Sequence, residues 1–228
     1  MSRKRMVLSI RSRILLLVIL SLFISVGSSG ILVFSSWTAS ARQSTRHIAE
    51  GINEDIYNRM VSFIRAPYQI NEISHHIIEQ GMINLDNERE RDRFFSWILD
   101  TFSKEVSSLG FGAADGAYYG ARKNGDGILI IRSDESTGGI TWGYALNEDY
   151  TAGELILKAD AYDPRTREWY IKAAAAGEPV YSSVYTRVIS GERTVSAAHP
   201  VYDGAGHLLG VLSTHLLLDD LDVYLRDI

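Results

Sequence analysis

Cysteine is absent from the 228 residues, and proline occurs only four times. The lack of cysteine excludes disulfide bonds, thiol nucleophiles and thiolate metal sites together. The sequence also contains no Asn-x-Ser/Thr glycosylation site, no Gly-x4-Gly-Lys-Ser/Thr phosphate loop, no His-Glu-x2-His zinc motif and no Gly-x-Ser-x-Gly nucleophile elbow. We therefore expect a chain without a resident cofactor.

Catalytic and metal-binding side chains are also poorly arranged. His75 and His76 are adjacent, so we expect them on different sides of their helix, where they cannot chelate as an i, i+4 pair does. Ser213 and His215 would share one face of a strand, but no third group is identified that could orient the histidine. The sequence therefore predicts no metal site, no catalytic residues and no enzyme.

Acidic residues dominate the chain beyond its first 13 residues. Those 13 hold five basic residues and no acid, which leaves 18 basic and 28 acidic residues, a formal charge of −10, for the remainder. An acidic body of this kind is a poor candidate for nucleic-acid binding. Because 46% of the residues are hydrophobic, a folded domain is expected rather than a disordered chain.

A run of 21 uncharged residues extends from Ile14 to Phe34 and has the length needed to cross the hydrocarbon core of a membrane. We predict a basic cytoplasmic tail over residues 1–13 and a transmembrane helix over 14–35, with the residues after about 36 outside the cytoplasm. The alternative is a signal peptide cleaved near Ala39-Ser40-Ala41. The apolar run is longer than the usual core of such a peptide.

Long helices are expected over residues 36–110. Pro67 should kink or interrupt the first of them, after which an apolar stripe continues to about Gly81. A second helix is expected from Asp86 to Leu109. The first stripe either packs on its own domain or faces a twin helix in a homodimer, and its members recur every four residues: Ile48, Ile52, Ile56, Met60 and Ile64.

From Phe111 onward, turn signals such as Asp115-Gly116 and the segment 203–206 separate short β-type runs. Long helices followed by such runs predict an α+β fold. The domain should span residues 111–218 as an antiparallel sheet of about five strands, with a helix inserted between the third and the fourth. Residues 219–228 would begin a connection to a missing segment.

The inserted helix carries a dense group of arginine and aromatic residues. Asp163 followed by Pro164 is a good helix start, because the carboxylate accepts free backbone N–H groups and proline needs none. Gly177 should end this helix. The spacing predicts that donors and aromatic faces surround the first turns of the helix, supplied by Arg167, Trp169 and Tyr170.

The pattern Tyr162-x4-Arg167-x-Trp169-Tyr170 resembles the Cache family of extracytoplasmic sensor domains of bacterial transmembrane receptors. The closing segment 200–203 and the apolar N-terminal helix strengthen this resemblance to the double-Cache type with a PAS-like distal module, which covers roughly residues 36–228. The resemblance implies that the four motif residues line a small-molecule pocket, and that amino-acid-binding members use them to hold the carboxylate of the ligand.

Two departures from that subgroup concern the ligand's ammonium group. The positions of its two contacting aspartates correspond here to Arg187 and His215. A cation about 4 Å from an ammonium costs roughly 4 kcal/mol, or about a thousandfold in affinity. With Arg167, Arg187 and a protonated His215 forming a basic site, the expected ligand is a small anion, carboxylate favoured. The candidate binding residues are Tyr162, Arg167, Trp169, Tyr170, Tyr185, Arg187 and His215.

Simpler roles stay open for several of these side chains. Arg167 could pair with Glu168 or Asp160 on the surface, and Trp169 and Tyr170 could be core residues. His215 could be a buried structural histidine rather than a contact that responds to pH.

The expected protein is the ligand-sensing domain of a homodimeric receptor at the bacterial cytoplasmic membrane, with one visible span. A receptor of this type would continue after Ile228 with a membrane-proximal module, a second span and an effector, so the chain is expected to be a fragment or a single-module form. The alternative is a secreted or tethered solute-binding module without signalling output. The sequence that follows Ile228 would discriminate between the two.

Overall fold

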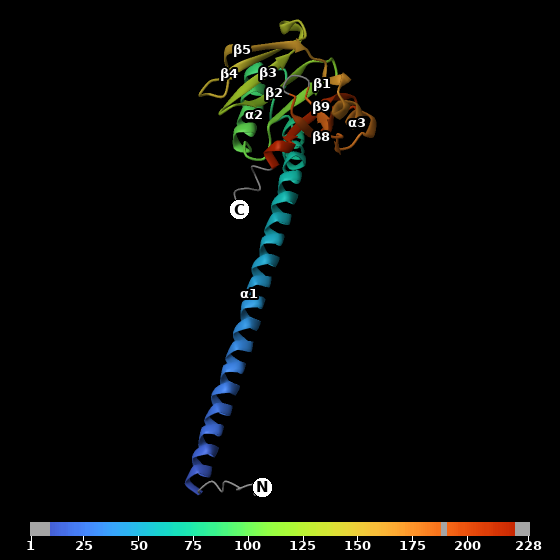
Figure 1. The fold of residues 1–228 in the computed structure, drawn as a ribbon. Helices are drawn as coiled ribbons and strands as arrows, with labels where there is room; N and C mark the ends of the chain where they lie inside the picture. Colours follow the sequence, from blue (N-terminus) through green and yellow to red (C-terminus); the bar gives the residue numbers. More distant parts are fainter. Residues whose placement is uncertain (1–9, 188–190, 222–228) are drawn as a thin grey trace. The chain divides into compact units, whose positions relative to one another are not determined.

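The structure is a computed structural model that describes residues 10–187 and 191–221 (Figure 1). The chain divides into two compact units, one ending at Ile56 and one beginning at Tyr57, and each is described by itself. Helix α1 (Ile10–Glu79) contributes residues to both units. Most of the predicted tail, at residues 1–9, and most of the predicted connection, at residues 222–228, lie outside the described residues.

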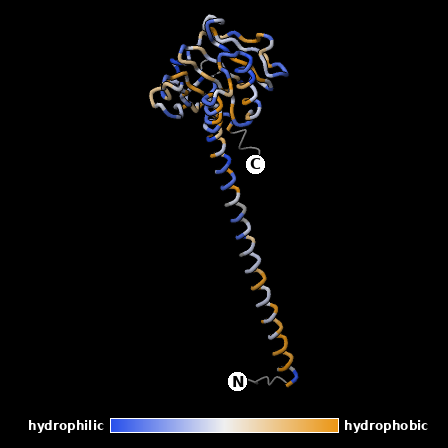
Figure 2. The backbone as a smooth tube through the Cα atoms, turned by 180° about the vertical axis from the view of Figure 1, so that it is seen from behind, coloured by the Kyte–Doolittle hydropathy of each residue, from blue (hydrophilic) through white to orange (hydrophobic). Residues whose placement is uncertain are grey.

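The first unit is helical over its described residues. Its segment Ile14–Ser44 is long and apolar enough to cross a membrane, with a mean hydropathy of 2.5 and no part of the most apolar window buried. Figure 2 shows the hydrophobic residues concentrated along the N-terminal part of α1. In water, each aliphatic side chain left exposed in this way lacks the stabilisation of about 1.5–3 kcal/mol that its burial would provide. The helix therefore fits the predicted membrane anchor.

Of the two outcomes predicted at Pro67, interruption does not occur, because α1 continues through it to Glu79; a kink stays a prediction. Proline removes one backbone donor from a helix and normally costs about 3 kcal/mol in its interior. Pro67 is itself buried, and the neighbouring residues Phe63, Ala66 and Ile70 pack into the domain. Burial of this face offsets the lost hydrogen bond.

The buried face of α1 also differs from the predicted stripe. Ile52, Met60 and Ile64 are 47%, 37% and 49% exposed, and the side chain of Ile48 lies outside the described residues. The buried face instead follows an i, i+3, i+4, i+7 spacing and consists of Phe63, Ala66, Pro67, Ile70, Asn71, Ser74 and Ile78. Formation of a homodimer through this helix stays a prediction.

Helix α2 (Glu88–Thr101) is shorter than expected. Asn87 begins it, because its side chain accepts hydrogen bonds from the backbone N–H groups of Arg89 and Glu90 at 3.1 and 3.2 Å. The predicted end at Leu109 is wrong. Leu109 belongs to strand β1 (Ser108–Ala113), where apolar residues alternate with glycines at a period of two.

All the strands belong to one antiparallel sheet in the order β5-β4-β3-β2-β1-β9-β8-β6, with β7 paired to β8. Helix α3 (Glu168–Ala176) lies between β5 and β6 in the chain, which confirms the α+β class with an inserted helix. Over the described residues the sheet has nine strands rather than about five, and the helix follows the fifth strand rather than the third. The other bounds are β2 (Tyr118–Asn124), β3 (Gly127–Ser133), β4 (Ile140–Leu146), β5 (Ala152–Ala161), β6 (Val180–Tyr181), β7 (Tyr185–Thr186), β8 (Arg193–Tyr202) and β9 (Leu208–Leu217).

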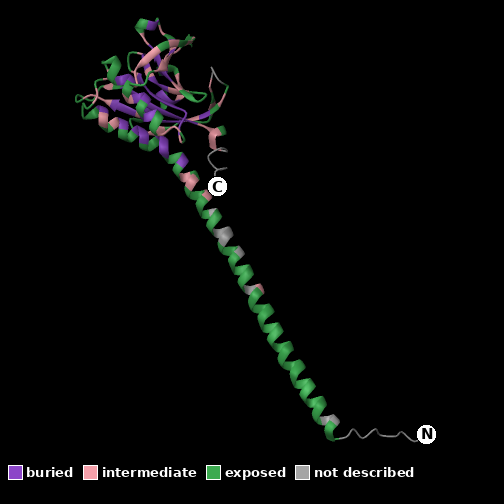
Figure 3. Cartoon of the chain, turned by 90° about the vertical axis from the view of Figure 1, so that its left-hand side faces the viewer, coloured by how far each residue is buried: buried purple, intermediate pink, exposed green. Residues whose placement is uncertain are grey.

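The sheet packs on both faces, and Figure 3 shows its buried residues in purple. On one face, Leu109 and Leu212 of the sheet pack with Phe63 of α1 and with Phe95 and Leu99 of α2. On the other face, Tyr118, Ala198 and Val211 of the sheet pack with Trp169 and Ala173 of α3. The second core holds α3, and with it the arginine-rich turn, against the sheet.

Gly112 of β1 makes the close approach of this turn feasible. A Cβ atom at this position would lie 2.6 Å from Cβ of Pro164 and 2.9 Å from the indole of Trp169. Real Cβ atoms essentially never come so close to other heavy atoms. The absence of a side chain at residue 112 therefore lets the turn and Trp169 rest directly on the centre of the sheet.

Candidate functional site

A cavity of about 350 Å³ lies on the α3 side of the sheet. Strands β1 to β5, the turn before α3, strand β7 and strand β9 all contribute to its walls. Its lining residues are Ser108, Tyr118, Ala121, Arg122, Ile131, Thr141, Asp160, Ala161, Tyr162, Thr166, Arg167, Glu168, Trp169, Tyr185, Thr186, Arg187 and His215. Six of the seven predicted binding residues are among them.

The start of α3 brings its arginine to this cavity. The carboxylate of Asp163 accepts a hydrogen bond from the N–H of Arg165 at 2.9 Å and begins a short 3-10 turn, Pro164–Thr166. Arg167 follows with an extended backbone as the N-cap of α3, and Gly177 ends the helix with φ of 69°. The predicted end at Gly177 is confirmed, whereas the predicted start at Asp163 begins the separate 3-10 turn and α3 itself begins at Glu168.

Arg167 has a guanidinium group without an acidic partner among the described residues. Its central carbon lies 4.6 Å from the ring centre of Tyr162, and its Nε is buried without a hydrogen bond. Glu168 is instead paired with Nζ of Lys172 at 2.6 Å. The alternative in which Arg167 forms a surface ion pair with Glu168 is therefore wrong.

Arg187 and Arg122 bring two further positive charges to the cavity. Arg187 donates to Oγ of Ser108 at 2.6 Å, and its guanidinium lies 3.8 Å from the carboxylate of Glu192. Burial, followed by the nearby charge of Arg187, lowers the pKa of Arg122. An arginine remains charged at neutral pH even so. The two cations therefore repel each other, a repulsion that a bound anion would relieve.

His215 is 5% exposed, and its Nδ1 lies 2.6 Å from Oγ of Ser196 and 3.3 Å from the hydroxyl of Tyr185. Burial, together with the charge of Arg187, lowers the pKa of His215 well below its ordinary value. The imidazole is thus neutral at pH 7. The expectation of a protonated His215 in the basic site is wrong, and Arg122 supplies the third positive charge.

Aromatic rings form the walls of the cavity, with one change from the prediction. Tyr118 and Tyr162 meet edge to face with ring centres 5.1 Å apart, and Trp169 packs beside His215 at 6.2 Å. Burial raises the pKa of Tyr118 to about 12, so its hydroxyl remains a neutral donor. Tyr170 is buried in the adjoining core and does not line the cavity.

Tyr118 and Arg122 are the main site residues that the sequence interpretation missed. They are four residues apart on β2, so they share one face of the strand with Gly120. An alternation of this kind over residues 118–122 was the available signal. The alternation identifies the residues that share one face of β2, but it does not identify the strands that pair with β2.

The neutral state of His215 predicts a dependence of stability on pH. The unfolded chain binds a proton below about pH 6.5 that the folded chain does not bind. Stability therefore rises with pH. It is fully present above that pH and should fall by up to about 1.4 kcal/mol per pH unit as the pH drops towards the folded pKa.

Urea unfolding of the full chain in detergent micelles, followed by tryptophan fluorescence between pH 7.5 and 5, measures this slope. The variant His215→Gln should lose the contribution, whereas His207→Gln should keep it, because His207 is an exposed residue outside the cavity. Identical pH profiles for the wild type and His215→Gln would contradict the prediction.

Comparisons with known proteins show which domains this chain resembles. Residues 125–223 match a family model described as methyl-accepting chemotaxis protein-like, first PDC sensor domain. The ligand-binding domain of the Campylobacter jejuni chemoreceptor Tlp3, in complex with L-valine, is 12% identical with a TM-score of 0.50, covering 77% of this chain and 60% of that one. This likeness concerns the fold alone.

Two amino-acid chemoreceptors of Pseudomonas aeruginosa PAO1 are also similar. The PctC domain with GABA is 22% identical (TM-score 0.43, covering 73% of this chain and 63% of that one). The PctB domain with L-Gln is 19% identical (TM-score 0.46, covering 78% and 58%). This chain spans about 60% of the length of the solved structures it matches. The family match over residues 125–223 and the architecture of the sheet support a Cache-type (PDC) sensor domain in this chain.

Proposed function

We propose that this chain is the ligand-sensing part of a transmembrane receptor and that its cavity binds a small organic anion, with a carboxylate favoured. The observation that carries the proposal is the buried Nε of Arg167, which has no hydrogen-bond partner among the described residues. A buried polar group left unsatisfied costs about 1–3 kcal/mol. A carboxylate in the cavity would accept bidentate hydrogen bonds from this guanidinium and remove that cost.

The charges along the cavity support an anion over an ammonium compound. Arg122, Arg167 and Arg187 contribute three positive charges, against the lining carboxylates of Asp160 and Glu168 and that of Glu192, which lies 3.8 Å from Arg187. Glu168 is already neutralised by Lys172. The cavity therefore has an excess of positive charge next to neutral aromatic donors, which attracts a carboxylate and repels a free amine.

Related domains bind ligands that carry a carboxylate. The domains of Tlp3, PctC and PctB were solved with L-valine, GABA and L-Gln, respectively. We infer that Arg167 anchors a carboxylate here as well. The rest of the ligand should differ, because Arg187 and Arg122 lie on the cavity wall where an ammonium group would need acidic partners.

The membrane placement follows from α1. Its apolar segment Ile14–Ser44 has the length of a membrane span, and five basic residues lie among the first 13. By the positive-inside rule, the N-terminus belongs in the cytoplasm and the sensor domain outside a bacterial cytoplasmic membrane. Signal would pass through α1 only as far as the ligand binds two receptor states with different affinity.

Titration calorimetry on the full chain in lipid nanodiscs tests the ligand class. Mono- and dicarboxylates of two to six carbons are compared with their amides and amines, for example succinate with succinamide and 1,4-diaminobutane. The three members of this series share a carbon chain and differ in charge. At least one acid should bind while its matched amide and amine do not. Tight binding of a neutral or cationic compound, with none for organic acids, would overturn the proposal.

A further inference from the structure

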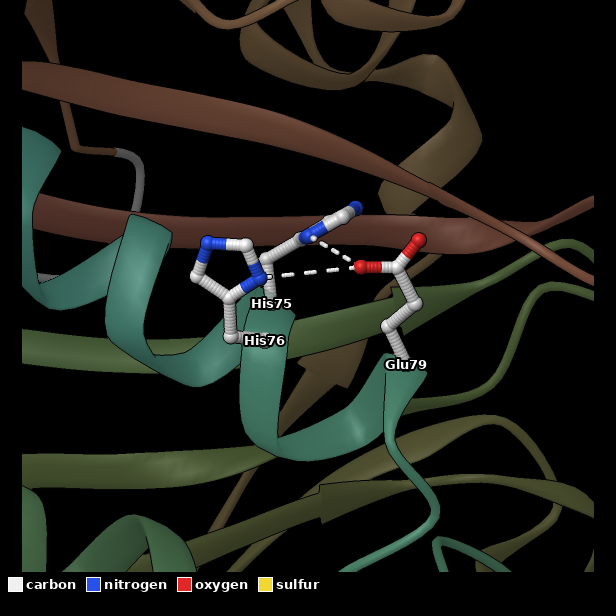
Figure 4. A group of neighbouring side chains, drawn as sticks. All are labelled: His75, His76 and Glu79. Carbon is white, nitrogen blue, oxygen red and sulfur yellow. Dashed lines mark ion pairs between the residues drawn. The ribbon is translucent and has the colours of Figure 1, made fainter.

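Two histidines and a glutamate converge at the C-terminal end of α1, away from the residues that line the cavity. Oε2 of Glu79 lies 3.8 Å from Nδ1 of His75 and 3.6 Å from Nδ1 of His76. Figure 4 shows both imidazole rings directing a nitrogen towards this one carboxylate oxygen. The three ligand atoms lie within 4.8 Å of one another.

The expectation that His75 and His76 cannot chelate as an i, i+4 pair does not consider Glu79. Glu79 is four residues after His75 and three after His76, and both spacings bring side chains together on a helix. The carboxylate therefore stands between the two imidazoles, which need not lie on one side of the helix to reach it. The absence of a metal site stays a prediction, and this geometry supplies a specific alternative to it.

From this geometry we propose that His75, His76 and Glu79 bind a divalent transition-metal ion of the Zn²⁺ class. Neutral imidazole and carboxylate are suitable ligands for zinc and related ions. Bonds of about 2.0–2.2 Å in a tetrahedral site place neighbouring ligand atoms roughly 3.3–3.5 Å apart. The two separations from Glu79 exceed this by only a few tenths of an ångström, and the two imidazole nitrogens lie within 4.8 Å of each other.

The remaining adjustment falls on side chains that are free to move. The side chains of His76 and Glu79 are 68% and 51% exposed, so small rotations can close the triangle without disturbing the core. The exposed position also leaves room for water as a fourth ligand, as in zinc sites with three protein ligands.

His75 is the fixed member of the cluster. Its ring stacks on that of His199 in β8, with centroids 4.1 Å apart and planes 8° from parallel. The preceding residue of β8, Ala198, packs in the core with Trp169. A metal ion at His75 would therefore link side chains of the last turns of α1. These turns lie beside β8, whose Ala198 packs in the same core as Trp169 of the cavity.

The simpler explanation is that Glu79 forms two surface ion pairs, one with His75 and one with His76. Histidine is charged only when protonated, and exposed ion pairs contribute little to stability. The two accounts differ in what they require of Glu79. An ion-pair cluster would bind zinc only weakly, whereas a built metal site binds it tightly and loses most of that affinity when any one ligand is removed.

Zinc binding to the full chain, untagged and in detergent micelles at pH 7.5, separates the two accounts. Calorimetry with ZnCl₂ should give one site per chain, with a dissociation constant on the order of micromolar, or about −8 kcal/mol. His76→Ala and Glu79→Gln should each weaken binding by at least roughly tenfold. Circular dichroism verifies that both variants keep their helix content.

His207→Gln is the matched control, because His207 and Asp203 form another exposed i, i+4 pair, with 3.1 Å between Nδ1 and Oδ2. This variant should bind zinc as the wild type does. The proposal is wrong if the wild type binds zinc only in the millimolar range, or if His76→Ala and Glu79→Gln bind it as tightly as the wild type. Neither result bears on the anion proposal, because none of the three residues lines the cavity.

Discussion

Arg167→Ala should abolish anion binding while leaving the domain folded. A hydrogen-bonded contact to a charged group contributes about 1.5–3 kcal/mol, which corresponds to roughly 10- to 150-fold in affinity. The upper part of this range is expected, because a bidentate contact in a partly buried cavity is lost. The domain should keep its stability, because the guanidinium of Arg167 has no acidic partner among the described residues and its Nε has no hydrogen bond to lose.

Calorimetry of the variants with the tightest-binding acid measures this effect. Arg167→Lys should bind with intermediate affinity, because it keeps the charge but not the planar fork. Arg165→Ala is the matched control. Arg165 belongs to the same turn, its guanidinium is held by Asp163 at 2.8 Å, and it does not line the cavity. Wild-type affinity in Arg167→Ala, or an equal loss in Arg165→Ala, would contradict the proposed anchor.

The local chemistry of the turn was predictable from the sequence, whereas the choice of side chains that face the ligand was only partly so. Asp163, Pro164 and Gly177 act through their own backbone neighbours, so the start of the 3-10 turn and the end of α3 follow from residue type. Trp169 and Tyr170 are adjacent on a helix, about 100° apart around its axis. Only one of them can face the cavity, and the exact start of α3 decides that it is Trp169.

Other features depend on contacts distant in sequence. Arg122 reaches the cavity because β2 pairs with β1 and β3 in one particular register. His215 is neutral because the packing of Trp169 and its surroundings removes it from water. Leu109 continued a helical spacing along the sequence, yet pairing of β1 with β9 placed it in the sheet. Tertiary burial outweighs the local pattern in each case.

Asp92→Ala should destabilise the sensor domain by about 3–5 kcal/mol, near the lower end of that range. Asp92 of α2 and Arg132 of β3 form a hydrogen-bonded ion pair, and the two residues are only 5% and 7% exposed. Burial disfavours the charged form of both partners and raises the pKa of Asp92, whereas for Arg132 the hydrogen bond and charge of Asp92, with help from Glu88, outweigh burial and raise the arginine pKa. Without Asp92, the guanidinium would remain buried with the exposed Glu88 as its acidic partner, at 2.8 Å.

Urea unfolding of the full chain in detergent micelles measures this loss, and a double variant separates charge from packing. Asp92→Leu combined with Arg132→Met removes both charges while filling the space, so it should be more stable than Asp92→Ala alone. Asp149→Ala is the control, since it breaks exposed ion pairs with Arg89 and Arg93 and should cost much less. If Asp92→Ala is no more destabilising than Asp149→Ala, or the double variant is the least stable, the buried pair does not hold α2 on the sheet.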